Sequence, residues 1–281
     1  GGFNLQPADK IKQGQKGLIG AGVIEPVGST WPTALADLDR VMDHQVPGTT
    51  TTRATRTIAT VTHPGGEFRD ATVIFQKALS HRFGDGSAVP NIASEGEGVP
   101  EDSHDAGQMA INYGSEPMWF RYGMPADSPF EQVGLGGVQN SHEAFSNVCC
   151  NNGGTATTAD ANVGDPVTPI FTAAPGQGLR MRLLEPTGAG RGTTFNLHGH
   201  AWQRAPYIAG KVASQTIGDN WLGMILGHQE SITPAAHFDI VPLNGAGGAN
   251  AVPGDYLFGD QGSFGTTSGL WGILRVEAAT E

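Results

Sequence analysis

Cationic side chains are scarce in this chain of 281 residues. Its 16 Lys and Arg residues stand against 27 Asp and Glu residues, which gives a formal net charge of -11 at pH 7. A groove for nucleic acid needs a positive surface to hold phosphates, so this charge balance argues against a nucleic-acid partner. The acidic excess favours cationic partners such as metal ions, and it also serves solubility.

Long apolar runs are absent as well. No stretch approaches the roughly 20 apolar residues that cross a bilayer, so we expect no membrane span. Cysteine is limited to the adjacent pair Cys149 and Cys150. A ring between the two neighbours, two bridges to elsewhere and two free thiols are all compatible with that pair. Because the chain starts at Gly1 without a Met or a signal peptide, we expect a processed or excised piece of a longer protein.

Turn-forming residues, in contrast, are abundant. The chain contains 42 Gly and 18 Pro, and charged residues make up only 15%. This composition favours short strands joined by many turns over long helices. The length allows one large all-β domain plus a fragment of another.

Apolar patterning predicts the following elements. Residues 17–26 are interpreted as a buried strand closed by Pro26, and residues 29–47 carry apolar side chains at helical spacing. The Thr-rich residues 49–62 are prone to form a strand. Clear strands are predicted at residues 71–76, 169–173, 179–184, 193–197, 237–241, 255–258 and 270–276. Residues 81–164 are irregular and Gly-rich, which is typical of a long loop insertion.

Two pairs of motifs in the C-terminal part follow each other in a fixed order. Residues 175–186 read Pro-Gly-Gln-Gly-Leu-Arg-Met-Arg-Leu-Leu-Glu-Pro, and residues 194–202 read Thr-Phe-Asn-Leu-His-Gly-His-Ala-Trp. Residues 253–258 (Pro-Gly-Asp-Tyr-Leu-Phe) then lead to residues 269–276 (Gly-Leu-Trp-Gly-Ile-Leu-Arg-Val). Together these segments resemble the C-terminal cupredoxin region of multicopper oxidases, in particular the large multidomain bacterial type linked to manganese oxidation.

The resemblance covers roughly residues 67–277. It implies an all-β fold, a cupredoxin-like Greek-key β-sandwich over residues 67–281 with a long insertion at about 81–164. Residues 1–31 resemble the terminal strand of an upstream cupredoxin domain, and residues 32–66 would then be a linker. The resemblance also implies a secreted, periplasmic or extracellular location, and other cupredoxin domains or chains as partners.

Most of the copper ligands that the resemblance implies are replaced. The family pattern His-Pro-x-His-Leu-His-Gly-His supplies a blue-copper ligand at its first His and ligands of the trinuclear copper cluster at its second and third. Those positions hold Thr193, Asn196 and His198 here. His198 therefore corresponds to a type 3 copper ligand. The fourth position, His200, matches a family position that is not a ligand.

The closing family motif, His-Cys-His-x-x-x-His, has lost every ligand. Its positions fall on Gly259, Asp260, Gln261 and Gly265. Blue copper is held by a soft thiolate together with two imidazoles. We therefore expect no type 1 copper site within this domain.

His198 and His200 remain as a His-x-His pair. Residues two apart on a strand point the same way, so the pair is predicted to aim both rings at one metal, copper in this family, with a third ligand from elsewhere. The alternative is that both are hydrogen-bonded polar residues at the end of a strand. His228 and His237 flank a turn and are expected to be surface residues.

Two functions from different classes fit these observations. The first is the C-terminal cupredoxin part of a multicopper oxidase, which couples oxidation of a metal ion or small substrate to dioxygen reduction, although this chain alone is not self-sufficient. The second is a non-enzymatic cupredoxin-like module that builds an extracellular assembly or binds a partner.

Overall fold

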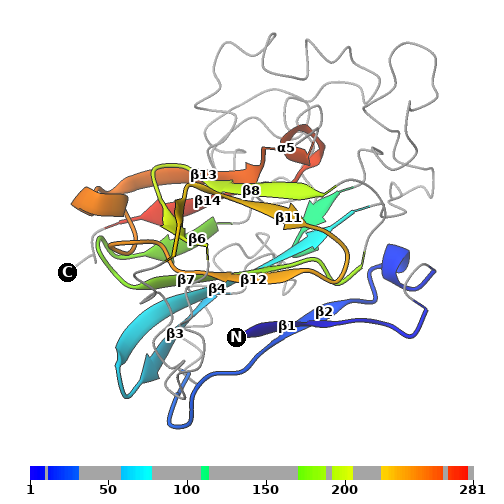
Figure 1. Ribbon diagram of the computed structural model, residues 1–281, viewed down its shortest axis with the longest axis horizontal. Coiled ribbons are helices and arrows are strands. Elements are labelled where there is room, and N and C mark those ends of the chain that lie inside the picture. The colour runs from blue at the N-terminus through cyan, green and yellow to red at the C-terminus, as the bar shows by residue number, and fades with distance from the viewer. Residues whose placement is uncertain are drawn as a thin grey trace, which may run out of the picture.

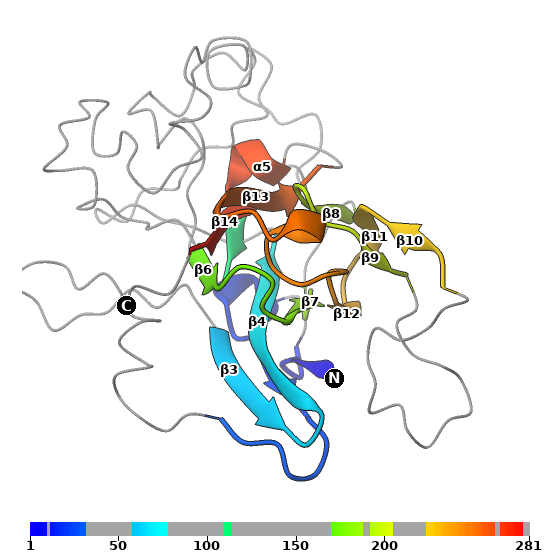
Figure 2. The same ribbon diagram turned by 90° about the vertical axis from the view of Figure 1, so that its left-hand side faces the viewer.

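Two β-sheets dominate the part of the chain that the structure describes (Figures 1 and 2). The computed structural model describes residues 1–9, 12–31, 58–77, 109–113, 170–187, 192–204, 223–261 and 265–277. The first sheet has the strand order β12-β7-β4-β3, with β5 paired to the end of β4, and the second has the order β11-β8-β13-β14-β6. The strands of the first sheet are β3 (Ile58–His63), β4 (Gly66–Gln76), β5 (Ala110–Ile111), β7 (Leu179–Leu184) and β12 (His237–Ile240). Those of the second are β6 (Ile170–Ala173), β8 (Thr193–Leu197), β11 (His228–Ile232), β13 (Gly254–Asp260) and β14 (Trp271–Val276).

The chain passes repeatedly between the two sheets. From β4 it crosses to β6, returns to β7, crosses to β8 and β11, returns to β12 and ends with β13 and β14. The pairs β4 with β7 and β6 with β14 are parallel, and the other pairs within the two sheets are antiparallel. This topology is a cupredoxin-like Greek-key β-sandwich, which confirms the predicted fold class.

Aromatic side chains join the two sheets in the core. Phe75 of β4 meets Phe195 of β8 edge to face, with ring centroids 6.2 Å apart. Phe195 in turn lies beside Phe258 of β13, which stacks on Phe171 of β6 at 5.4 Å. All four side chains are fully buried, so each removes a large apolar area from water.

Most predicted strands are confirmed. The strands predicted at residues 169–173, 179–184, 193–197 and 270–276 differ from β6, β7, β8 and β14 by at most one residue at an end. β4 begins earlier than predicted, at Gly66, and β13 is longer than predicted at both ends, because the added residues are mostly polar or Gly and carry little apolar pattern. β3 lies inside the expected linker 32–66, and its pairing with β4 places it in the first sheet.

Several sequence predictions lie outside the described residues. They include the helical pattern after Trp31, the pair Cys149 and Cys150, and the insertion 81–164 apart from residues 109–113. Within the described residues, no helix is long and apolar enough to cross a membrane.

The described residues 1–9 and 12–31, called the N-terminal strap below, form a further layer on the outer face of the first sheet (Figure 1). Their strands β1 (Gly2–Leu5) and β2 (Gly20–Val23) pair antiparallel. The strand predicted at residues 17–26 is present as the shorter β2, but its predicted burial is wrong, since β2 is half-buried and the flanking Leu18 and Ile24 are 60% and 67% exposed. The small residues of β2 make room for the outward side chains of β1, because Phe3 and Leu5 lie over Gly22 and Gly20.

A buried ion network fixes the strap to the sheet. Arg182 of β7 is fully buried, and its Nε lies 2.8 Å from Asp70 Oδ1 and its Nη1 3.0 Å from Asp239 Oδ1. Glu25 of the strap pairs with Arg182 and also with Arg180, whose Nη1 lies 3.0 Å from Glu25 Oε2. Burial by itself would lower the pKa of Arg182, but the carboxylates of Asp70, Asp239 and Glu25 outweigh it and raise that pKa.

Removal of Glu25 tests how strongly the strap is held. Glu25→Ala leaves Arg180 and Arg182 buried with one carboxylate fewer, so we expect a loss of about 3–5 kcal/mol in the free energy of unfolding. Urea denaturation of the variant against the unmodified chain measures it. Glu67→Ala, at an exposed position, is the control and should lie within about 0.5 kcal/mol. Equal stability of the two variants would contradict the role of the network.

Candidate functional site

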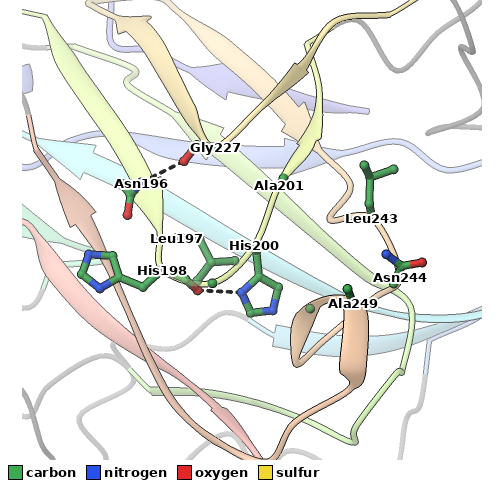
Figure 3. A pocket seen from close by; sticks show the side chains of 11 residues that line it. Asn196, Leu197, His198, His200, Ala201, Gly227, Leu243, Asn244 and Ala249 are labelled. Atoms are coloured by element: carbon green, nitrogen blue, oxygen red, sulfur yellow. Dashed lines mark hydrogen bonds between the residues drawn. The ribbon is translucent and has the colours of Figure 1, made fainter.

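The His-x-His pair lies in a turn just after β8 rather than on the strand. β8 ends at Leu197, and Gly199 between the two histidines has φ +71. A left-handed residue reverses the chain direction, so the alternation of a strand no longer applies. Figure 3 shows the rings of His198 and His200 pointing away from each other.

Both ring nitrogens of His200 are occupied by the backbone. Nδ1 lies 2.8 Å from the carbonyl oxygen of His198, and Nε2 lies 3.0 Å from the backbone nitrogen of Gly247. A carbonyl only accepts and a backbone N–H only donates, so Nδ1 carries the proton and Nε2 accepts. Burial lowers the pKa of His200, with the bond to His198 opposing, and the ring of Tyr256 packs against it at 4.8 Å.

The structure therefore does not bring His198 and His200 together as a chelating pair. The single lone pair of His200 is used by Gly247, and a metal could bind there only if that buried hydrogen bond broke. The geometry matches the alternative reading for His200, a hydrogen-bonded residue at the end of a strand. His198 is exposed. Among the described residues, no group of three His, Cys, Asp or Glu side chains converges on one point.

An open pocket of about 700 Å³ surrounds this turn (Figure 3). Its polar lining comes mainly from Asn196, His198 and Asn244, and Leu243 and Ala249 add apolar surface. Asn196 donates a 2.8 Å hydrogen bond from Nδ2 to the carbonyl of Gly227, which ties β8 to the start of β11. Among the described residues that line the pocket, His198 has the exposed imidazole. This ring could act as a base or bind a metal.

The positions that match the blue-copper ligands converge at the other end of β8. Asp260, at the end of β13, lies opposite Phe195, and its Oδ1 accepts a 2.9 Å hydrogen bond from the backbone N–H of Thr194. Gly265 begins the short helix α5 (Gly265–Ser268), which lies beside the end of β13 in Figure 2. A Cβ at Gly265 would approach Asp260 Oδ2 to 2.1 Å, so this carboxylate fills the space next to that position.

These residues do not fit a type 1 copper ion. The group at the thiolate position is the carboxylate of Asp260, which is buried and already bound by the backbone. Thr193 and Gly265 stand at the two imidazole positions, and neither offers a nitrogen ligand from its side chain. Blue copper needs a thiolate and imidazoles, so the donor set at this end has the wrong chemistry.

The expectation that His228 and His237 are surface residues is confirmed. His228 is exposed on β11, and its Nε2 lies 3.2 Å from Glu230 Oε2, which in turn pairs with Arg204. His237 is exposed at the start of β12. The predicted turn at 228–237 is shorter than expected because β11 occupies its first half.

Sequence reasoning missed a buried ion pair near Asp260. Lys77 Nζ lies 3.1 Å from Glu185 Oε2, and their side chains are 3% and 0% exposed. Burial raises the pKa of Glu185 to about 7, Lys77 opposes this, and the carboxylate of Asp260 adds to it. Each of the two residues stands just after a strand, where charged residues are common, so no signal in the sequence marks them.

Comparison with known proteins finds likeness only at the level of structure. No protein-family model matches the sequence, and no curated protein matches it. A multicopper oxidase aligns over 74% of this chain and 44% of its own, with 10% identity and a TM-score of 0.36. The laccase from Botrytis aclada aligns over 74% and 29%, with 14% identity and a TM-score of 0.38. The copper nitrite reductase from Nitrosomonas europaea aligns over 75% and 49%, with 12% identity and a TM-score of 0.35. This chain thus spans less than half the length of each of these structures, and likeness this remote assigns neither family nor function.

The two histidines of the turn should respond differently to substitution. His200→Ala leaves the buried N–H of Gly247 without its acceptor, so we expect a loss of about 1–3 kcal/mol in the free energy of unfolding. His198→Ala removes an exposed side chain and should change stability by less than about 0.5 kcal/mol. Thermal and urea unfolding of the two variants measure both effects. A larger loss for His198→Ala than for His200→Ala would contradict the hydrogen-bonding scheme.

The raised pKa of Glu185 predicts a dependence of stability on pH. The folded-state pKa of about 7 lies above the ordinary value of 4.5, so this contribution to stability is fully present below pH 4.5 and is lost as the pH rises through 7. Glu185→Gln removes the titration. We therefore expect the stability of the unmodified chain, measured relative to Glu185→Gln, to fall between pH 5 and pH 8. A difference that stays constant or rises over this range would refute the assignment.

Proposed function

We propose that this chain is the C-terminal cupredoxin part of a protein of the multicopper oxidase type, and that it forms one wall of a copper site without holding type 1 copper itself. The observation that carries the proposal is the agreement between the ligand positions taken from the sequence motifs and their places in the fold. Asn196 and Gly259, both at cluster-ligand positions, face each other across β8 and β13. Asp260 and Gly265, at blue-copper positions, are in contact.

His198 is the residue through which this chain would serve a copper cluster. Its side chain is exposed, and it lines the pocket. Copper bound there would need its remaining ligands from another cupredoxin domain or chain, and it would supply the electron transfer to dioxygen. The substrate class that we propose is a metal ion or a small reductant, and the acidic surface charge favours the former.

The N-terminal strap offers a surface for such a neighbouring domain. Among the described residues, six of the ten large hydrophobic side chains that are exposed belong to the strap: Phe3, Leu5, Leu18, Ile24, Val27 and Trp31. Gly2 and Asn4 contact the sandwich on one face of β1. Phe3 and Leu5, which alternate with them, lie on the other face. Surface patches of this kind are typical of sites that a protein partner covers.

The same surface supports a second candidate, a non-enzymatic module of an extracellular assembly. A partner that covers the exposed apolar side chains of the strap fits either case, and only the role of His198 separates the two functions. In a purely structural module, replacement of His198 leaves copper content and electron transfer unchanged.

Copper analysis of the complex between this chain and its cupredoxin partner, or of the polypeptide that contains both, tests the proposal. His198→Ala should reduce the copper content and abolish the absorption of the coupled type 3 pair. His237→Ala, at an exposed position of the other sheet, is the control and should change neither. Normal copper content and oxidase activity in His198→Ala would refute the proposal and favour the structural module. Intense blue absorption from this chain alone would refute the claim that it lacks a type 1 site.

A further inference from the structure

The buried pair of Lys77 and Glu185 lies at the end of the sandwich where the blue-copper positions converge. Lys77 directly follows β4, and Glu185 directly follows β7. These strands run parallel, and Ile74 lies opposite Leu184, so both side chains leave the first sheet at the same end. Their charged atoms, Nζ and Oε2, are 3.1 Å apart and shielded from water.

The second sheet contributes a further carboxylate to this end. Asp260 is buried, close enough for its charge to act on Glu185, and fixed by the N–H of Thr194. The hydroxyl of Thr266 donates to the backbone carbonyl of Asp260 and holds α5 against β13. The described charges at this end are therefore one ammonium and two carboxylates, drawn from both sheets.

Neutral polar groups at the same strand ends add to this site. Thr193 begins β8 and Ser268 precedes β14, and the hydroxyl oxygens of both are buried without a hydrogen-bond partner. Burial of such polar atoms without a partner is costly in an apolar core. This end of the sandwich is thus polar, in contrast to its aromatic centre.

We propose that the ammonium group of Lys77 is the resident cation of this end and takes the structural place that a type 1 copper ion would have. It neutralises Glu185 and Asp260 in part and so holds the ends of β4, β7 and β13 together. The ion pair itself lies within this chain, whereas the comparison with a copper ion rests on the ligand positions of the proposed function. It explains why the carboxylate at the thiolate position is tolerated without a metal.

Substitutions that separate charge from volume test the proposal. Lys77→Met keeps most of the side chain but removes the charge, which leaves two buried carboxylates without the cation, and we expect the Tm to fall by about 10 °C. Lys77→Met combined with Glu185→Gln removes both charges of the pair and should recover more than half of that loss. Lys16→Met, at an exposed position, is the control and should leave the Tm unchanged.

Rescue by an added cation distinguishes a charge site from mere packing. Lys77→Ala leaves space at the site, so we expect ethylammonium to raise the Tm of this variant by several degrees above the effect of potassium at equal ionic strength. The unmodified chain should show no such difference. A double variant as unstable as Lys77→Met, or no difference between ethylammonium and potassium in Lys77→Ala, would overturn the proposal. If Lys77→Ala does not fold, the double variant alone decides, and neither readout involves copper or oxidase activity.

Discussion

The parallel pairing of β4 with β7 is the constraint on which the rest of the structure depends. One register places Asp70 opposite Arg180 and Thr72 opposite Arg182, which brings Asp70 within hydrogen-bonding distance of Arg182 on the outer face of the sheet. The same register brings Lys77 next to Glu185 at the strand ends. A shift of one residue would turn each of these charges towards the apolar side. The Arg182 network and the Lys77–Glu185 pair therefore form only in this register, and both stabilise it.

The fold could be predicted from the sequence to the extent that strands carry apolar patterns. In β7 (Leu-Arg-Met-Arg-Leu-Leu) apolar residues alternate with Arg before two Leu, and β14 (Trp-Gly-Ile-Leu-Arg-Val) is mostly apolar. The predicted bounds of both strands agree with the structure to within one residue. β11 (His-Gln-Glu-Ser-Ile) has only one apolar residue, so its sequence does not predict a strand. β11 forms a strand because it pairs with β8. The strap resembles the end of another domain in sequence. The strap is bound to the first sheet by the ion pair of Glu25 with Arg182. These two residues are 157 positions apart in the sequence, so no local pattern can reveal their contact.

The candidate site was predicted less well because its geometry depends on one backbone dihedral angle. The His-x-His motif would aim two rings at one metal if β8 continued, but the left-handed Gly199 ends that alternation. His200 then becomes a support for the loop at Gly247, and His198 is the exposed imidazole of the two that line the pocket. Residue type alone tells which side chains stand at the positions of a copper motif, so the sequence could place Thr193 and Asp260 there as an expectation. The buried pair of Lys77 and Glu185 depends on the arrangement of strands in space, which the sequence does not reveal.

We propose that the ammonium of Lys77 supplies the positive charge that holds this end of the cupredoxin-like sandwich, where the buried carboxylates of Glu185 and Asp260 lie. Anomalous diffraction at the copper absorption edge, from crystals of the chain soaked in copper, tests this most directly. We expect no anomalous peak near Asp260 and a refined contact between the ammonium of Lys77 and the carboxylate of Glu185. A copper peak between Thr193 and Asp260, with Lys77 displaced from Glu185, would contradict it.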